Sequence, residues 1–131
     1  MRLLDTNIVS YWIRGDSNII SRLMYWAPCE LAISAITLAE ILYGIEKSPI
    51  KKEHRRYKID SICSQLNILT FDDNAAQQYA IVRADLEKNG VPISERDLQI
   101  AAIALAHDLC VVTHNTKEFS RVKGLSVEDW S

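Results

Sequence analysis

Four acidic side chains occupy positions where a carboxylate could take part in chemistry. Asp5 directly follows the apolar run of residues 1–4, and Asp97 opens a largely apolar stretch that ends at residue 107. Glu40 has no charged residue three or four positions away on either side, and Glu118 follows the apolar run of residues 109–112. Carboxylates gathered at one place repel one another unless a divalent cation neutralises them, and an oxygen-rich site suits Mg²⁺ or Mn²⁺. Such an ion polarises a phosphoryl oxygen and activates water for attack on a phosphodiester.

Each of these acids also has a simpler structural explanation. Asp5 could cap the helix that follows it, and Glu40 could be a solvated glutamate on a helix face. Two pairs of residues have the spacing of a helix cap, namely Ser94 with Asp97 and Asn115 with Glu118. Taken singly, none of the four acids identifies a site, so the interpretation depends on whether the fold brings them together.

The elements that must position these acids alternate between strands and helices. Apolar runs predict strands at residues 1–4, 29–33, 66–71 and 109–113, with a last edge strand near 125–127. Helices are predicted at residues 8–12, 19–26, 34–47, 51–66, 73–89 and 94–107, followed by a short helical turn after Asn115. This alternation indicates an α/β fold with a parallel sheet covered on both faces. The site of such a fold lies at the carboxyl ends of the strands, where Asp5 and residues 113–118 should emerge.

Length, composition and charge restrict the class of protein. The chain has 131 residues, of which 48% are hydrophobic and 24% charged, as in one soluble globular domain. The net charge of −2 excludes a polybasic nucleic-acid coat, although it leaves room for a local basic patch. The three cysteines have neither a disulfide framework nor a zinc spacing. We find no signal-peptide pattern and no apolar run of the ~20 residues that a membrane span needs, so we expect a cytoplasmic protein.

At these acids the sequence resembles the PIN-domain ribonucleases, and specifically toxins of the VapC type. The resemblance rests on four short segments: LLDTN at residues 3–7, ISAITLAEILYG at 33–44, DLQIAA at 97–102 and VVTHNTKEF at 111–119. They occur in the order typical of the family and span nearly the whole chain. The combination is therefore highly specific, although each segment would be weak by itself.

The resemblance implies a single PIN domain over residues 1–131, folded as a three-layer α/β/α sandwich with a short parallel sheet. It implies that Asp5, Glu40 and Asp97 form an acidic metal site that binds Mg²⁺, or Mn²⁺ in its place. Many relatives have a further acid after the threonine of the last segment. Here that position holds the amide Asn115, and Glu118 lies one helical turn further on, so either residue could complete the site. Side chains expected to support the ligands through hydrogen bonds are Thr6, Asn7, Thr113 and Asn115.

The implied activity is that of an endoribonuclease acting as the toxin of a toxin–antitoxin pair. Asp5 and Asp97 would ligate the metal directly, and Glu40 would ligate through water or orient the nucleophile. Asn115 or Glu118 would position water at the metal. The expected partners are RNA, a cognate VapB-type antitoxin whose tail covers the site, and a second copy of the chain in a homodimer or larger assembly, with no membrane partner.

Two other classes of function stay open on the residues alone. An aspartate after the first strand could serve a phospho-acceptor or phosphoryl-transfer domain, but residues 5–7 lack the second aspartate of an Asp-x-Asp phosphatase and no lysine ends the fourth predicted strand. A non-catalytic PIN-like RNA-binding module would require an incomplete metal site, and all three core acids are present. The basic stretch of residues 47–58 could follow an RNA backbone, while a solvated helix face is the simpler interpretation.

Overall fold

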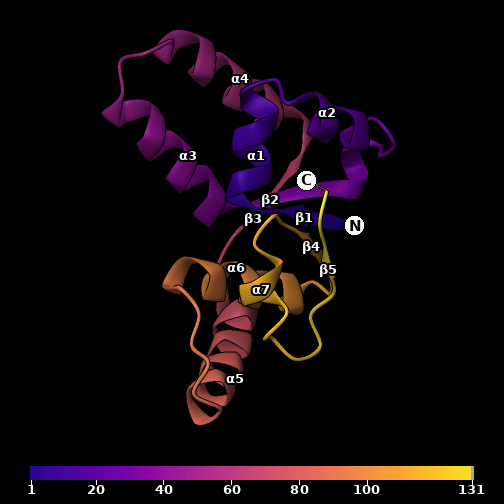
Figure 1. Ribbon diagram of the computed structural model, residues 1–131, viewed down its shortest axis with the longest axis vertical. Coiled ribbons are helices and arrows are strands. Elements are labelled where there is room, and N and C mark those ends of the chain that lie inside the picture. The colour runs from indigo at the N-terminus through magenta and orange to yellow at the C-terminus, as the bar shows by residue number, and fades with distance from the viewer. Residues whose placement is uncertain (131) are drawn as a thin grey trace.

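Five short parallel strands form one sheet in the order β3-β2-β1-β4-β5 (Figure 1). The computed structural model describes residues 1–130, so Ser131, the last residue of the predicted domain, lies outside the described residues. The strands are β1 (Arg2–Leu4), β2 (Leu31–Ser34), β3 (Asn67–Leu69), β4 (Cys110–Val112) and β5 (Val127–Glu128). In the register of the central strand, Leu4 is paired with Ile33 on one side and Val112 on the other. The carboxyl ends of β1 and β4 are therefore neighbours, which places Asp5 beside Thr113.

Helices cover both faces of this sheet, as the alternation of elements predicts (Figure 1). One layer contains α1 (Thr6–Ile13), α2 (Ser17–Leu23), α3 (Ala35–Lys47) and α4 (Lys52–Gln65). The other contains α5 (Asp73–Lys88), α6 (Glu95–Ala106) and the short α7 (Thr116–Phe119), and a 3₁₀ turn (Pro28–Glu30) precedes β2. Alternate strand residues supply the two cores, since Leu4 packs with the first layer and Leu3 with the second. The three-layer α/β/α sandwich is confirmed.

Capping side chains set where the helices begin. Ser34 accepts a hydrogen bond from the Thr37 N–H at 3.0 Å and starts α3, and Asp72 accepts one from the Ala75 N–H at 2.9 Å and starts α5. Asp5 caps α1 in the same way, so this helix begins at Thr6, two residues earlier than the apolar pattern predicts. The predicted strand at 66–71 is shorter than expected, because only residues 67–69 pair with β2.

The second layer contains α6, which has more buried residues than any other helix within residues 1–130. Six residues of α6 are buried, namely Leu98, Ile100, Ala101, Ala102, Ile103 and Ala104. Phe119 of α7 is fully buried in the same core. This anchor holds the otherwise short α7 against α6, and thereby fixes the position of Glu118 next to it. No helix within residues 1–130 is both long and apolar enough to cross a bilayer.

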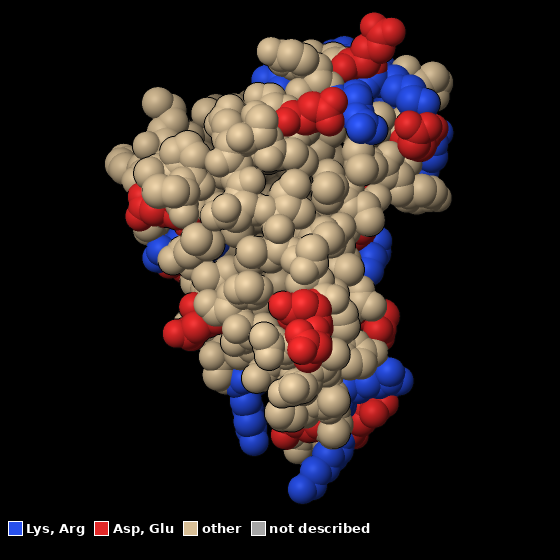
Figure 2. Space-filling model, turned by 180° about the vertical axis from the view of Figure 1, so that it is seen from behind, with Lys and Arg blue, Asp and Glu red and all other residues tan. Residues whose placement is uncertain are grey.

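The basic stretch of residues 47–58 runs from the end of α3 into α4, and Lys52, Arg55 and Arg56 are engaged within the fold. Arg55 donates to the carbonyl oxygens of Gly44 at 3.2 Å and Ile50 at 2.9 Å, and also to that of Ser48. Lys52 pairs with Glu46, and Arg56 with Asp60. Figure 2 shows the result at this end of the molecule, where basic and acidic side chains lie next to one another. This arrangement supports the interpretation as a solvated helix face rather than a uniform basic surface.

We expect Arg55→Gln to destabilise the fold by about 2 kcal/mol, since hydrogen bonds from a charged donor to several carbonyl groups are lost. Arg56→Gln removes the same charge from the next position, where the exposed pair with Asp60 contributes at most about 0.5 kcal/mol. Urea unfolding of both variants measures the difference. Equal stability of the two variants would show that the contacts of Arg55 do not hold the α3–α4 connection.

Candidate active site

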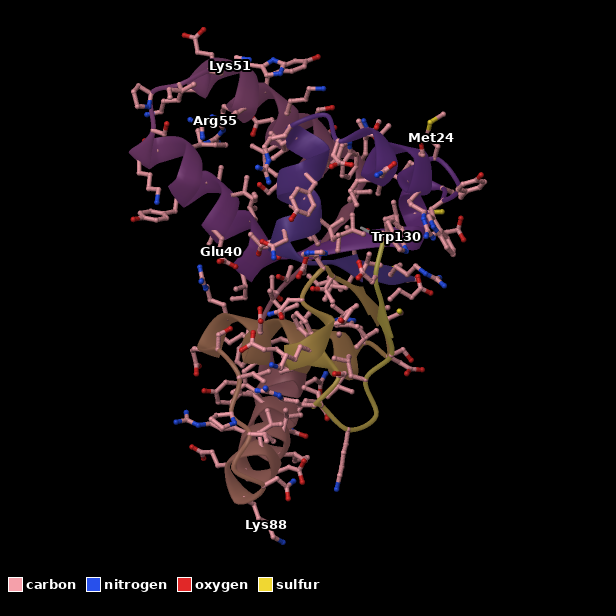
Figure 3. The ribbon with its side chains drawn as sticks, in the orientation of Figure 1. Met24, Glu40, Lys51, Arg55, Lys88 and Trp130 are labelled. Carbon is pink, nitrogen blue, oxygen red and sulfur yellow. The ribbon has the colours of Figure 1, made fainter. Side chains whose placement is uncertain are left out.

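An acidic cavity of about 340 Å³ opens at the edge of the sheet where β1 and β4 end. All four acids singled out in the sequence line it, although they come from distant parts of the chain. Its walls are formed by Asp5, Thr6, Asn7, Glu40, Ser94, Arg96, Asp97, Asn115 and Glu118. Thr113, the remaining predicted site residue, is fully buried and contacts Asp5. Figure 3 shows Glu40 near the place where α3 leaves the sheet, facing the layer that holds α6.

Two larger surface hollows, of about 630 and 580 Å³, lie elsewhere on the molecule. The first is beside Trp130, and the second lies along α3 and α4. Each contains acids that already pair with cations, since Glu128 lies 2.8 Å from Arg2 and Asp60 lies 3.2 Å from Arg56. In the acidic cavity, by contrast, Asp5, Asp97 and Glu118 form no ion pair with a lysine or arginine of residues 1–130, and Glu40 alone does so.

Asp5 is buried in the wall of the cavity, with 3% of its surface exposed. Its carboxylate accepts a hydrogen bond from the Ile8 N–H at 3.2 Å and another from the Thr113 hydroxyl. The capping role and the candidate ligand role therefore belong to the same residue. Burial raises the pKa of Asp5, although these hydrogen bonds favour the charged form, and the charge of Glu40 raises it further. Among residues 1–130 no lysine or arginine forms an ion pair with Asp5.

Glu40 is held from two sides. The Thr6 hydroxyl donates to Glu40 Oε1 at 2.7 Å, and the guanidinium of Arg96 pairs with Oε2. The sequence indicates no partner for Glu40 along its own helix, and the structure supplies one from α6 instead. Arg96 is the residue of this site that the sequence analysis missed. Its one available signal was a cation directly before Asp97.

Asp97 and Glu118 are bridged by the side-chain amide of Asn115. Asn115 Nδ2 donates to Asp97 at 3.0 Å and to Glu118 at 2.6 Å. The expectation that the Asn115 side chain caps the following helix is wrong, because the cap of α7 contains no side-chain hydrogen bond. The amide turns instead toward the two carboxylates, where it can neutralise part of their repulsion.

The predicted capping box at the start of α6 is only half formed. The Asp97 N–H donates to Ser94 Oγ at 3.2 Å, as expected. The reciprocal bond does not come from Asp97, because the Ser94 N–H donates to Glu118 at 3.0 Å. Glu118 therefore holds the first turn of α6 rather than its own helix, which corrects the local-cap interpretation. Because Glu118 accepts this bond in place of Asp97, the Asp97 carboxylate is free to face the cavity.

The electrostatics of this pair show excess negative charge. Burial, the neighbouring Glu118 and the charge of Asp5 together raise the pKa of Asp97 to about 7. The pKa of Glu118 is lowered, first because Asp97 donates a hydrogen bond to it and also because the Ser94 N–H and Asn115 do so. A raised pKa for one acid and a lowered pKa for its neighbour is the usual response of crowded carboxyl groups that have no cation between them.

The donor set fits a hard divalent cation, although it is not closed around one. Within residues 1–130, no group of three or more acidic, histidine or cysteine side chains could hold a metal ion in the arrangement that the structure shows. Glu40 is turned toward Thr6 and Arg96, and Asn115 occupies the gap between Asp97 and Glu118. The available ligands are nevertheless all oxygen atoms, and the raised pKa values of Asp5 and Asp97 report a charge that Mg²⁺ or Mn²⁺ would offset.

Comparison with known proteins identifies the family of this chain. The family model described as PIN domain matches residues 2–125. Ribonuclease VapC2 of Rickettsia felis is 39% identical over 130 residues, covering 98% of this chain and 96% of the relative. The tRNA(fMet)-specific endonuclease VapC of Shigella flexneri is 36% identical over 129 residues, covering 98% and 97%. The chain belongs to the PIN-domain family, in its VapC-type ribonuclease branch.

Solved structures of VapC-type proteins share the PIN-domain fold described above. VapBC2 from Rickettsia felis, bound to a DNA fragment from its promoter, aligns with a TM-score of 0.91 at 38% identity and covers 99% of this chain and 98% of the other. DNA-bound VapBC from Salmonella typhimurium aligns with the same TM-score of 0.91 at 35% identity, with the same coverage of 99% and 98%. The similarity thus spans the whole PIN domain, including every element that lines the cavity.

We expect the stability of the metal-free PIN domain to fall as the pH rises from about 4 to about 7. The pKa of Asp97 is 3.8 in an ordinary setting and about 7 in the folded protein, so the folded state binds more protons in this range. Because asparagine does not titrate, the stability of Asp97→Asn should fall less steeply with pH than that of the wild type. Urea unfolding in EDTA across this pH range measures it, with Asp60→Asn as the control for loss of one exposed charge. If the free energy of unfolding of Asp97→Asn and of the wild type changed in parallel with pH, Asp97 would not have the raised pKa.

Proposed function

We propose that this PIN domain is a Mg²⁺-dependent endoribonuclease that hydrolyses RNA phosphodiesters. The observation that carries the proposal is the convergence of Asp5, Glu40, Asp97 and Glu118 on one cavity, at the sheet edge where α/β folds bind their ligands. Asp5 and Asp97 have raised pKa values, chiefly through burial, and neither forms an ion pair within residues 1–130. The names of the relatives support the substrate class, since they are ribonucleases or an RNA-specific endonuclease.

The proposed role of the metal site is to assemble the phosphodiester and the attacking water. Asp5, which is buried, and Asp97, which is half-buried, supply the ligating oxygens, because neither forms an ion pair within residues 1–130 and both have raised pKa values. The chemistry that bound Mg²⁺ supplies is Lewis acidity, which withdraws charge from a phosphoryl oxygen and acidifies water. Thr6 fixes Glu40 Oε1, so Glu40 Oε2 is the atom placed to orient the water and take its proton. Glu118 supports metal binding through its negative charge beside Asp97, and it also accepts the Ser94 N–H at the first turn of α6, which carries Asp97.

We further propose that the protein acts as the toxin of a toxin–antitoxin pair. Its structural relatives from Rickettsia felis and Salmonella typhimurium are VapBC complexes, which supports a VapB-type antitoxin as the partner of this chain. The acidic cavity suits a partner segment that brings a cation to Asp5 or Asp97. The homodimer and larger assemblies stay predictions. Co-purification with the product of a neighbouring small gene, and loss of RNA cleavage in that complex, test the pairing.

The phospho-acceptor alternative fits the structure less well. Asp5 is 3% exposed, and its carboxylate is engaged by the Ile8 N–H and the Thr113 hydroxyl. A nucleophilic aspartate needs an oxygen open to the phosphodonor, and β4 is followed by Thr113 where this alternative requires a cation. A stable acyl-phosphate on Asp5 after incubation with a small phosphodonor, detected by mass spectrometry, would support the alternative.

We expect Asp5→Asn to abolish RNA cleavage and relieve toxicity while the fold stays intact. The loss should exceed the roughly 10- to 100-fold effect of removing a supporting partner, because the variant removes a direct ligand. Stability of the metal-free protein should hold or rise, since the raised pKa of Asp5 shows that burial disfavours its charge. Cleavage assays in Mg²⁺ and mapping of RNA 5′ ends after induction measure the effect, with Asp60→Asn as control. Wild-type cleavage by Asp5→Asn would refute the metal assignment of Asp5.

A magnesium titration can distinguish the roles of Asn115 and Glu118 at the metal site. Asn115→Asp replaces the amide between Asp97 and Glu118 with a third carboxylate. We expect lower thermal stability without metal, a larger stabilisation by Mg²⁺, and half-maximal cleavage at a lower Mg²⁺ concentration. Glu118→Gln should raise that concentration about 10- to 100-fold. An unchanged midpoint in Glu118→Gln, with correct folding by circular dichroism, would limit Glu118 to holding the start of α6.

A further inference from the structure

Arg96 is the one lysine or arginine among the residues that line the acidic cavity. It lies in the first turn of α6, directly before Asp97, and its guanidinium pairs with Glu40 Oε2. The side chain of Arg96 is 67% exposed, whereas that of Glu40 is 17% exposed. The cation therefore reaches over the mouth of the cavity from solvent, and the pair uses one of the five N–H donors of the guanidinium.

The pair with Glu40 is not needed to build the fold. Glu40 is already held by the Thr6 hydroxyl at 2.7 Å, and its helix is capped and packed independently by Ser34 and the apolar residues of α3. An arginine that is mostly exposed contributes little to stability through one ion pair. Any RNA that approaches the cavity, however, brings more negative charge to a place that already holds four carboxylates. A cation at the mouth is the chemical group that such a substrate requires.

We propose that Arg96 binds a phosphate of the RNA at the mouth of the cavity and exchanges Glu40 for that phosphate. This inference rests on the proposed ribonuclease function. The planar guanidinium can donate two parallel hydrogen bonds to a phosphate, a geometry that it shares with its carboxylate pairs. The exchange also releases Glu40 Oε2, the atom assigned to orient water. Arrival of substrate and release of Glu40 are then the same event, and Arg96 confers part of the affinity for RNA.

The first test measures RNA binding without cleavage, in the Asp5→Asn background. A labelled single-stranded RNA is titrated by fluorescence anisotropy at several salt concentrations. Each phosphate contact contributes about 0.7 to the slope of log K against log salt for single strands. Adding Arg96→Gln should reduce the slope by about 0.7 and weaken binding about tenfold at low salt, and Arg96→Lys should keep the slope but bind more weakly. Arg83→Gln removes the same charge from exposed α5 and should leave both quantities unchanged.

The second test measures kinetics in the otherwise wild-type protein. Arg96→Gln should raise KM about tenfold and leave the Mg²⁺ midpoint unchanged, because substrate affinity is lost while the metal ligands are kept. If Arg96 only positions Glu40, KM and the salt slope stay at the wild-type values while kcat falls or the Mg²⁺ midpoint rises, and the inference is wrong. If the wild-type protein neither binds nor cleaves RNA, the proposed function itself fails and the inference falls with it.

Discussion

The mutual repulsion of carboxylates is the constraint on which the rest of this structure depends. Asp5 is buried at the end of the central strand, and Asp97 faces the same cavity with a pKa raised to about 7. A protein that concentrates charge in this way must offset it through hydrogen bonds, bound protons or cations. The structure uses hydroxyl donors from Thr6 and Thr113, the Asn115 amide between Asp97 and Glu118, and the guanidinium of Arg96. None of these neutralises Asp5 itself, so a divalent cation remains the natural counterpart of the site.

Secondary-structure capping is adapted to the needs of this cavity. Asp5 caps α1 and still presents its carboxylate at the cavity wall. At α6 the cap is divided between two segments, because Glu118 takes the Ser94 N–H that Asp97 would bind in a complete capping box. Without that division, Asp97 would be committed to its own helix. Helix capping and metal binding are therefore not competing explanations of these acids, because the hydrogen bonds that cap the helices also place the carboxylates at the cavity.

The distribution of charge over the molecule supports a site that recognises RNA locally. At the α3–α4 end, Lys52 and Arg56 pair with neighbouring acids and Arg55 holds carbonyl groups, so this end is not a uniformly basic surface (Figure 2). With a net charge of −2, bulk attraction cannot supply affinity for a polyanion. Recognition must then come from the cavity and its rim. In that setting a single exposed arginine beside the carboxylates carries more weight than a larger patch at a distance.

The sequence by itself determined the α/β class, the parallel sheet and the identity of the acids. The first two follow from hydrophobic periodicity and helix caps, and the acids lie in four short segments that occur in the order typical of PIN domains. It also placed Asp5 and residues 113–118 at the same sheet edge, since parallel strands share their carboxyl ends. Only the tertiary structure decided which side chains meet. The pair of Glu40 with Arg96, the bridge of Asn115 and the bond from Ser94 to Glu118 all join segments from different helices or connections. Such contacts depend on the relative height and rotation of packed helices, which buried side chains such as Phe119 fix and local patterns do not encode.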